Sequence, residues 1–403
     1  MKTVCCSNMP FVADAFGTLG ETVVKDGRAI TSADVRDADL LAVRSTTRVN
    51  RELLEGSRVR FVGTATIGTD HMDLPWLEQQ GIRWRYAPGC NANSVSEYVT
   101  AALLCLADRH GLTLRGKTMG VVGVGNVGAK VVDKARALGM RVLVNDPPRQ
   151  RTGEAQHVSP ADSSESFPFV ELDVVRREAD VVTFHVPLIR DGRDRTVHMA
   201  DAFFFDGLKP GAILINAARG PVVDSDALLA ALEAGMVRHA VLDTWEGEPN
   251  YRRDVLARVD MATPHIAGHS FEGKVMGTVM VYREACRFLG VDPTWTPDAL
   301  LPEPTAPGRE MAANNRNDEA VLRELVRAVY DIEADDLALR ETAAPGFKAP
   351  TGTTRDKPAH ASGFDALRKN YPIRREFRFT QVALTGASPA LLSAVRKLGF
   401  DLP

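Results

Sequence analysis

The chain has 403 residues, more than one ordinary hydrophobic core organises, so its length predicts two or three domains. Apolar residues make up 44% and charged residues 25%, and the formal net charge is −3, a profile typical of globular proteins. This balance excludes the global positive field of proteins that bind nucleic acid or an anionic membrane.

The N-terminal segment MKTVCCSNMPFVADAF has no apolar signal-peptide core, and no run of about 18 apolar residues follows, so we expect a cytoplasmic protein. The five cysteines are an odd number without a C-x-x-C pair. We therefore expect reduced thiols and neither disulfides nor a metal site.

Short apolar runs alternate with amphipathic segments from the first residue. The runs KTVCC, ETVVK, LLAVR, RFVGTAT and IRWRY predict strands, with helices between them. A second such series runs from TMGVVGVGNVG to MATPHIAGHS, and the helical run FEGKVMGTVMVYREACRFLG follows it. This alternation predicts βαβ units on parallel sheets. The Pro-rich stretch 292–307 predicts a linker. Beyond it, DEAVLRELVRAVYDI predicts a helix, REFRFTQVALTG a strand and PALLSAVRKLGF a helix, which together predict a third, small α/β domain.

A dinucleotide fingerprint, Gly123-Val-Gly125-Asn126-Val127-Gly128, lies between an apolar strand and a helical run. Its glycines permit a tight turn, close approach of a pyrophosphate, and packing of helix on strand. The motif alone is weak, but Asp146 ends the next strand at about the 20-residue spacing of an acid that binds ribose hydroxyls. A carboxylate there favours NAD over NADP, although Arg149 and Arg151 are close enough in sequence to accept a 2′-phosphate.

Three later strand ends carry Arg219, Glu248 and His265. Carboxyl ends of parallel strands converge on the ligand crevice, so these side chains are expected to meet there. Oxidation of a 2-hydroxy acid needs a base, a cation for the carboxylate, and an anion that stabilises the protonated base. His265, Arg219 and Glu248 match these needs, although each taken singly is more often a capping or surface residue.

The segments GVGNVG, NAARGPVVD, DTWEGEP and TPHIAG resemble the D-isomer-specific 2-hydroxyacid dehydrogenases. The resemblance implies an α/β fold of two doubly wound parallel-sheet domains, a flavodoxin-like substrate or lid domain (1–93 and 266–290) with an inserted Rossmann NAD domain (94–265). It implies Arg219, Glu248 and His265 as catalytic residues. It also implies NAD contacts beyond the fingerprint and Asp146, at Val186, Ala217, Ala218, Arg219, Asp243 and Gly268.

Further segments resemble one branch of this family, which oxidises 4-phospho-D-erythronate at C2 during pyridoxal phosphate synthesis. They are VRSTTRVN, FVGTATIGTDHMD, APGCNANSVSEYV, NDPPR, YDIEADDLALR and FDALRKNYPIRREF. The branch implies a C-terminal dimerisation domain (291–403), a homodimer, and substrate contacts at Ser45, Thr66 and His269. His269 replaces the usual Tyr, and Val186 replaces a common Thr, so both contacts depart from the pattern.

Two alternatives stay open on the sequence alone. The chain can be a 3-phosphoglycerate dehydrogenase or another D-2-hydroxyacid dehydrogenase, or an NAD-sensing binding protein on the same fold. A basic cluster, Arg368-Lys369-Asn370-Tyr371 with Arg374-Arg375, suits a phosphate. We expect it to reach the partner's active site in a dimer, or else to be a solvated face.

Overall fold

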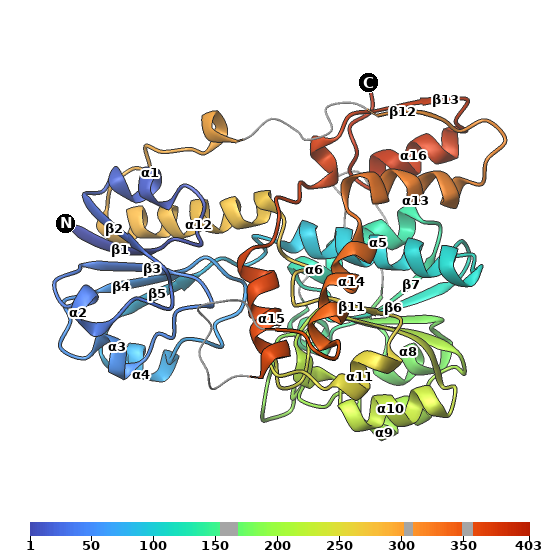
Figure 1. Cartoon of the computed structure of the whole chain (residues 1–403), viewed down its shortest axis with the longest axis horizontal. Helices are drawn as coiled ribbons and strands as arrows, with labels where there is room; N and C mark the ends of the chain where they lie inside the picture. Colours follow the sequence, from blue (N-terminus) through green and yellow to red (C-terminus); the bar gives the residue numbers. More distant parts are fainter. Residues whose placement is uncertain (154–167, 302–308, 349–357) are drawn as a thin grey trace. The chain divides into compact units, whose positions relative to one another are not determined.

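The structure is a computed structural model that describes residues 1–153, 168–301, 309–348 and 358–403. Contacts divide the chain into two compact units. Unit 1 is Met1–Ala92 with Ser270–Glu303, and unit 2 is Asn93–His269 with Pro304–Pro403 (Figure 1). The chain therefore leaves unit 1, builds the nucleotide-binding part, and returns to unit 1 before its C-terminal segment. Among the described residues, no helix is both long and apolar enough to cross a membrane.

Unit 1 contains a five-stranded parallel sheet in the order β2-β1-β3-β4-β5. This is the strand order of flavodoxin-like folds, as the family resemblance implied. Its strands are β1 (Lys2–Cys6), β2 (Glu21–Lys25), β3 (Leu40–Val43), β4 (Phe61–Thr64) and β5 (Arg83–Tyr86). Its helices are α1 (Val12–Gly17), α2 (Ser32–Val35), α3 (Arg51–Leu54), α4 (Leu74–Gln79) and α12 (Phe271–Leu289).

Alternation along the strands gives this sheet two apolar faces. Leu40 and Ala42 pack with α12, whereas Leu41 and Val43 pack on the opposite face. On the α12 face a side chain at Gly63 would lie only 2.3 Å from Val281, so the helix rests directly on β4. The returning segment thus completes the core of unit 1.

Unit 2 contains a six-stranded sheet in the order β11-β10-β9-β8-β6-β7, and all its pairs are parallel. Its strands are β6 (Thr118–Val122), β7 (Arg141–Asn145), β8 (Val181–Phe184), β9 (Ala212–Asn216), β10 (Val237–Leu242) and β11 (Met261–Ala262). Its helices are α5 (Ala92–His110), α6 (Asn126–Ala137), α7 (Pro147–Thr152), α8 (Leu172–Glu178), α9 (Ala202–Asp206), α10 (Ser225–Glu233) and α11 (Arg253–Arg258). The strand order reverses between β6 and β8, which is the point where doubly wound folds bind nucleotides.

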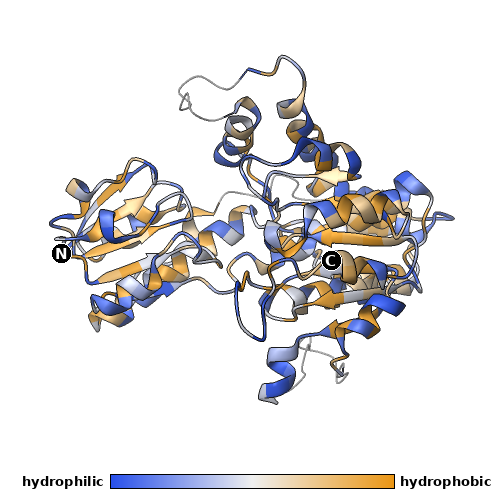
Figure 2. Cartoon of the chain, turned by 90° about the horizontal axis from the view of Figure 1, so that it is seen from below, coloured by the Kyte–Doolittle hydropathy of each residue, from blue (hydrophilic) through white to orange (hydrophobic). Residues whose placement is uncertain are grey.

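The C-terminal segment adds a small parallel pair of strands and four helices to unit 2. These elements are β12 (Arg309–Ala312), α13 (Asp318–Val329), α14 (Ile332–Ala343), α15 (Ala359–Lys369), β13 (Val382–Thr385) and α16 (Pro389–Lys397). Lys134 of α6 donates to the Leu398 carbonyl over 2.7 Å, and their surroundings form one apolar core. Figure 2 shows the apolar strands of both sheets, with polar residues on the outer helix faces.

The α/β class and the parallel sheets expected from the sequence are confirmed. Both predicted helices of the C-terminal segment form, as α13 and α16. The predicted strand forms only at Val382–Thr385, because Phe377–Phe379 adopts a 3-10 turn before it. Part of the predicted linker, residues 302–307, lies outside the described residues. The division into three domains stays a prediction, because contacts group the C-terminal segment with the nucleotide-binding part.

Candidate active site

The glycine loop between β6 and α6 has the geometry of a phosphate cradle. Gly123 has φ +85°, and a side chain there would lie 2.8 Å from the His185 carbonyl and from Val186. A Cβ on Gly128 would lie 2.0 Å from the Gly123 carbonyl oxygen. A Cβ on Gly125 would meet nothing within 4 Å, so the space above this residue is open. The three glycines thus have three different surroundings, and their binding of a pyrophosphate stays a prediction.

No side chain caps the N-terminus of α6, which begins at the exposed Asn126 and continues through Val127. Unpaired N–H groups at a helix N-terminus bind phosphates. Asp146 follows β7, and its carboxylate accepts hydrogen bonds from Val124 N (2.8 Å) and Arg149 N (3.1 Å). It therefore lies at the glycine loop and is partly exposed, in agreement with a ribose contact. The Arg149 guanidinium donates to the Val124 carbonyl, whereas Arg151 pairs with Asp194.

Asp243, at the end of β10, holds the loop that carries His265. It is 1% exposed, and its carboxylate accepts from Thr263 Oγ1 (2.7 Å), Ile266 N (2.7 Å) and Ala267 N (3.0 Å). Its carbonyl accepts from His265 N over 2.7 Å. Burial raises the pKa of Asp243, opposed by the charge of His265 and by these hydrogen bonds. In this structure Asp243 thus positions the His265 loop.

His265 and Glu248 form a direct pair. His265 Nδ1 lies 2.5 Å from Glu248 Oε1, and Glu248 Oε2 accepts from Trp245 N over 3.1 Å. Each side chain of the pair is 27% exposed. Burial alone would raise the pKa of Glu248, but the charge and hydrogen bond of His265, helped by the charge of Arg368, hold it at about 2. The pair therefore consists of an ionised carboxylate and an imidazole whose Nε2 is left for another partner.

Arg219 follows β9, in the same row of strand ends as Glu248 and His265. The Asn216 side chain accepts from Ala218 N (3.1 Å) and donates to the Arg219 carbonyl (3.0 Å), which fixes the turn through Ala217. Arg219 Nη1 donates to the Ala218 carbonyl over 2.8 Å. The predicted catalytic residues thus all lie at carboxyl strand ends of the unit 2 sheet.

Gly268 and His269 are the last residues of unit 2 before the chain returns to unit 1. The His269 ring packs edge to face against Tyr371 of the C-terminal segment, with 5.7 Å between ring centroids. His269 therefore replaces the usual Tyr at a position that contacts another aromatic residue.

The predicted substrate residues Ser45 and Thr66 lie in unit 1, each two residues beyond a strand end. Thr66 Oγ1 lies 2.7 Å from Thr64 Oγ1 and donates to the Gly68 carbonyl over 2.8 Å. Thr64 Oγ1 in turn contacts His71 Nε2 at 3.0 Å. These bonds order the loop that the sequence singled out.

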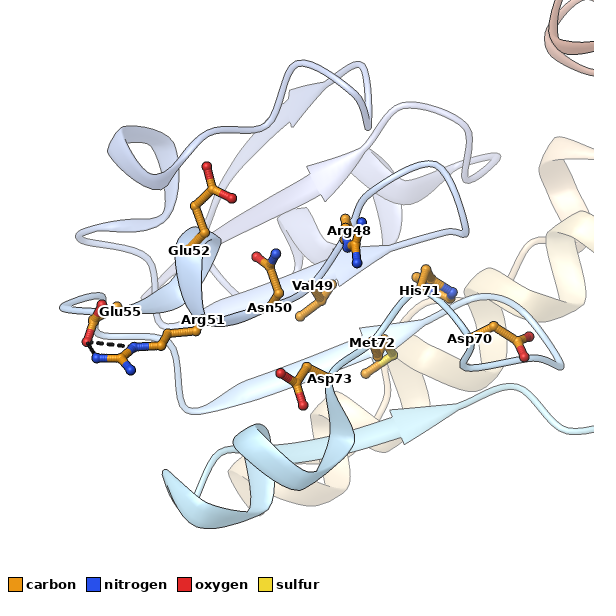
Figure 3. Close-up of a pocket in the computed structure, with 10 residues that line it drawn as sticks. All are labelled: Arg48, Val49, Asn50, Arg51, Glu52, Glu55, Asp70, His71, Met72 and Asp73. Carbon is orange, nitrogen blue, oxygen red and sulfur yellow. Dashed lines mark hydrogen bonds and ion pairs between the residues drawn. The ribbon is translucent and has the colours of Figure 1, made fainter. Parts of the chain in front are cut away.

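An open pocket in unit 1 is lined by Arg48–Glu52, Glu55 and Asp70–Asp73. Figure 3 shows the Arg51–Glu55 ion pair at one end and Asp70 with His71 at the other. None of the predicted site residues lines this pocket, and its charges are mixed. It is therefore not a candidate for the reaction centre.

His110, His239 and Asp260 are the one set of potential metal ligands that the described residues bring together. Both imidazoles contact the same carboxylate oxygen directly, at 2.8 and 2.9 Å. Ligand atoms around a tetrahedral zinc lie farther apart, at about 3.3 Å. We interpret the set as hydrogen-bonded to itself, and the expectation of no metal stays a prediction.

Comparison with known proteins relates the chain to a family over its whole length. It is 48% identical to the erythronate-4-phosphate dehydrogenase of Edwardsiella ictaluri, covering 100% of this chain and 99% of the relative. The enzyme of the same name from Escherichia coli O157:H7 is 45% identical, covering 100% of this chain and 98% of the relative. The chain belongs to the erythronate-4-phosphate dehydrogenase family.

Two family models match separate parts of this family member. Residues 98–267 match the NAD-binding domain of the D-isomer-specific 2-hydroxyacid dehydrogenases, so the chain is an NAD-dependent oxidoreductase of that larger family. Residues 300–399 match a family described only as a domain of unknown function. The glycine loop, Asp146 and the α6 N-terminus fit NAD, as the sequence predicted.

Solved structures give the same fold. The TT0316 protein of Thermus thermophilus has a TM-score of 0.59 at 27% identity and covers 73% of this chain and 99% of its own. The NAD⁺-bound 3-phosphoglycerate dehydrogenase of Entamoeba histolytica has a TM-score of 0.59 at 21% identity and covers 72% of this chain and 95% of its own. About a quarter of this dehydrogenase therefore has no counterpart in these neighbours.

The sequence did not reveal one contributor to the site, Tyr98, and it assigned the basic cluster that contains Arg368 to the partner's active site. Tyr98 of α5 lies 2.8 Å from Thr263 Oγ1 and so supports the Asp243 loop. Arg368 acts on Glu248 through its charge, from a helix 120 positions further along the chain. No local pattern marks either role, because both depend on contacts between distant segments. Arg374 corrects an expectation, since it is only 5% exposed and cannot present a charge to a solvent-filled cleft.

Proposed function

We propose that the protein oxidises 4-phospho-D-erythronate at C2 to 2-oxo-3-hydroxy-4-phosphobutanoate, a step of pyridoxal 5′-phosphate synthesis. The observation that carries the proposal is the relation to erythronate-4-phosphate dehydrogenases over the entire chain, including the C-terminal segment. A 3-phosphoglycerate dehydrogenase is disfavoured, because the structural likeness to one covers only 72% of the chain.

In the proposed reaction His265 is the base. With Nδ1–H donating to Glu248, its Nε2 carries the lone pair that accepts the C2 hydroxyl proton. The ionised Glu248 stabilises the imidazolium that results. Arg219 binds the substrate carboxylate, and Ser45, Thr66 and His269 contact the rest of the substrate. Bound NAD supplies the acceptor for the hydride from C2.

The cofactor would be held by the glycine loop, the α6 N-terminus and Asp146. Val186, beside Gly123, and the turn through Ala217 and Ala218 would line the site. Asp243 would act mainly by holding the catalytic loop, while Gly268 contacts NAD through its backbone. An NAD sensor without chemistry is disfavoured, because the His265–Glu248 pair is fully formed.

We further propose a cytoplasmic homodimer that uses the C-terminal segment. Leu337 of α14 and Ile373 are each 59% exposed, unusual for large apolar side chains. Light scattering on the purified protein would measure the mass, and a monomer that remains fully active would contradict the proposal.

The decisive assay follows NADH formation with erythronate 4-phosphate and 3-phosphoglycerate side by side. We expect a higher kcat/KM for erythronate 4-phosphate. A higher kcat/KM for 3-phosphoglycerate would contradict the proposed substrate but not the proposed reaction class, the oxidation of a 2-hydroxy acid. Binding of NAD without oxidation of either compound would favour the sensor.

A further inference from the structure

Three contacts join the C-terminal segment to the loops that carry Glu248 and His265 in the same chain. Phe364 of α15 packs against Tyr251 (5.8 Å between centroids), which lies just beyond Glu248. Tyr371 packs against His269, and Arg374 donates to the Ala267 carbonyl. Residues 364–374 therefore contact the segments that directly follow Glu248 and His265 in the sequence.

Arg368 lies in the middle of this stretch, in the last turn of α15. Its guanidinium carbon is 5.9 Å from the centre of the Phe364 ring. Its Nε is buried and has no hydrogen-bond partner in the described parts of the chain, whereas the residue as a whole is half-buried. Because a buried hydrogen-bond donor without a partner is unfavourable, this nitrogen is a candidate donor to an anion.

The positive charge of Arg368 also acts on the site, because it helps to lower the pKa of Glu248. In the proposed reaction Arg219 is assigned to the substrate carboxylate. A substrate with a carboxylate and a phosphate therefore needs a further cation. A guanidinium suits a phosphate especially well, because two parallel N–H groups can bind two oxygens.

We propose that Arg368 binds the phosphate of the substrate, so that the domain of unknown function supplies a specificity residue to the active site of its own chain. This inference rests on the proposed reaction, and it goes further by assigning phosphate recognition to α15. The two arginines of the basic cluster then differ in role: Arg374 is buried and structural, whereas Arg368 binds the ligand.

A structural role for Arg368 is the competing explanation, because a cation in the last turn of a helix stabilises that helix by about 0.3–1 kcal/mol. The adjacent Lys369 has the same relation to the helix end and is exposed. It therefore supplies a matched control, Lys369→Ala.

The experiment compares Arg368→Ala, Arg368→Lys and Lys369→Ala with the wild type, using 4-phospho-D-erythronate and unphosphorylated D-erythronate at saturating NAD. For Arg368→Ala we expect KM for the phosphorylated substrate to rise about 10- to 100-fold, with kcat within about threefold. KM for D-erythronate should stay unchanged, Arg368→Lys should recover part of the loss, and Lys369→Ala should behave as wild type.

Equal KM changes for both substrates, or an unchanged KM for the phosphorylated one, would overturn the role of Arg368. Melting temperatures and light scattering verify that the variants fold. If Arg368→Ala does not, Arg368→Gln takes its place. If the wild-type protein does not oxidise 4-phospho-D-erythronate, the proposed substrate is wrong. Arg368 is then tested with 3-phosphoglycerate and D-glycerate, where the same selective KM rise is expected.

Discussion

The His265–Glu248 pair carries the proton transfer of the proposed reaction. Because the pKa of Glu248 is held at about 2, below its ordinary 4.5, its stabilising effect is complete above pH 4.5 and is lost only as pH falls through about 2. Titration of Glu248 therefore cannot limit activity near neutral pH.

Replacement of Glu248 with Gln tests this pair. The amide no longer stabilises the imidazolium, so the acid limb of the kcat/KM profile should move to lower pH. We expect kcat to fall by up to about 100-fold, within the range for general acid–base groups. A pH series of steady-state rates measures both effects, and a fully active variant with an unmoved profile would contradict the assignment of Glu248.

Asp146 is expected to select NAD by charge. Its carboxylate lies at the glycine loop, where it would repel a 2′-phosphate, and Asp146→Ser removes that repulsion. We expect weaker NAD binding and a shift of about tenfold toward NADP in the ratio of kcat/KM values. If the wild type already uses both cofactors equally, Arg149 at the same loop outweighs Asp146.

Among the elements, the turn from β6 into α6 shows how one motif combines structural and ligand-binding glycines. Gly128 touches the Gly123 carbonyl, whereas Gly125 faces open space. Close backbone packing and open space for a ligand both exclude side chains, so both positions need glycine and the motif can be recognised in the sequence. Which glycine serves which need is decided by the packing of α6 against the loop.

The pair of substitutions Gly128→Ala and Gly125→Ala separates these needs. In Gly128→Ala the new Cβ would clash with backbone, so we expect the apo protein to lose about 1–3 kcal/mol of stability. Gly125→Ala should leave the apo melting temperature unchanged yet weaken NAD binding, because its methyl enters the phosphate space. Thermal denaturation and NAD titration measure the two effects, and identical behaviour of the variants would refute the division.

For the whole molecule, the buried Arg374 links the C-terminal segment to the nucleotide-binding part of unit 2. Its guanidinium lies 4.3 Å from the centre of the Tyr330 ring and donates to the Ala267 and Ser94 carbonyls. These contacts join three segments that are far apart in the sequence. Arg374 therefore belongs to the framework around the catalytic loop.

Arg374→Ala should destabilise the protein by about 3 kcal/mol, because it removes charge-assisted hydrogen bonds and leaves a cavity. The exposed Arg396 of α16 is a suitable control, and Arg396→Ala should change stability by less than about 0.5 kcal/mol. Chemical denaturation of both variants gives the comparison. Equal stabilities would show that Arg374 does not join the segments.

The sequence by itself determined most of the elements and the position of the fingerprint, and it predicts the catalytic trio, because these follow from local periodicity and from residues at strand ends. The runs KTVCC and LLAVR alternate between two apolar faces, and each became a strand of the unit 1 sheet. Gly123–Gly128, Arg219, Glu248 and His265 were predictable because a parallel sheet aligns its carboxyl strand ends.

Only the tertiary structure decided the roles within the basic cluster. Arg368, Arg374 and Tyr371 are similar candidates in the sequence, yet Arg374 is buried, Tyr371 contacts His269, and the buried Nε of Arg368 has no hydrogen-bond partner among the described residues. Likewise, the use of Asp243 as a clamp on the His265 loop depends on three hydrogen bonds from residues 263–267. Burial and charge pairing between distant segments arise from packing, which local sequence patterns do not encode.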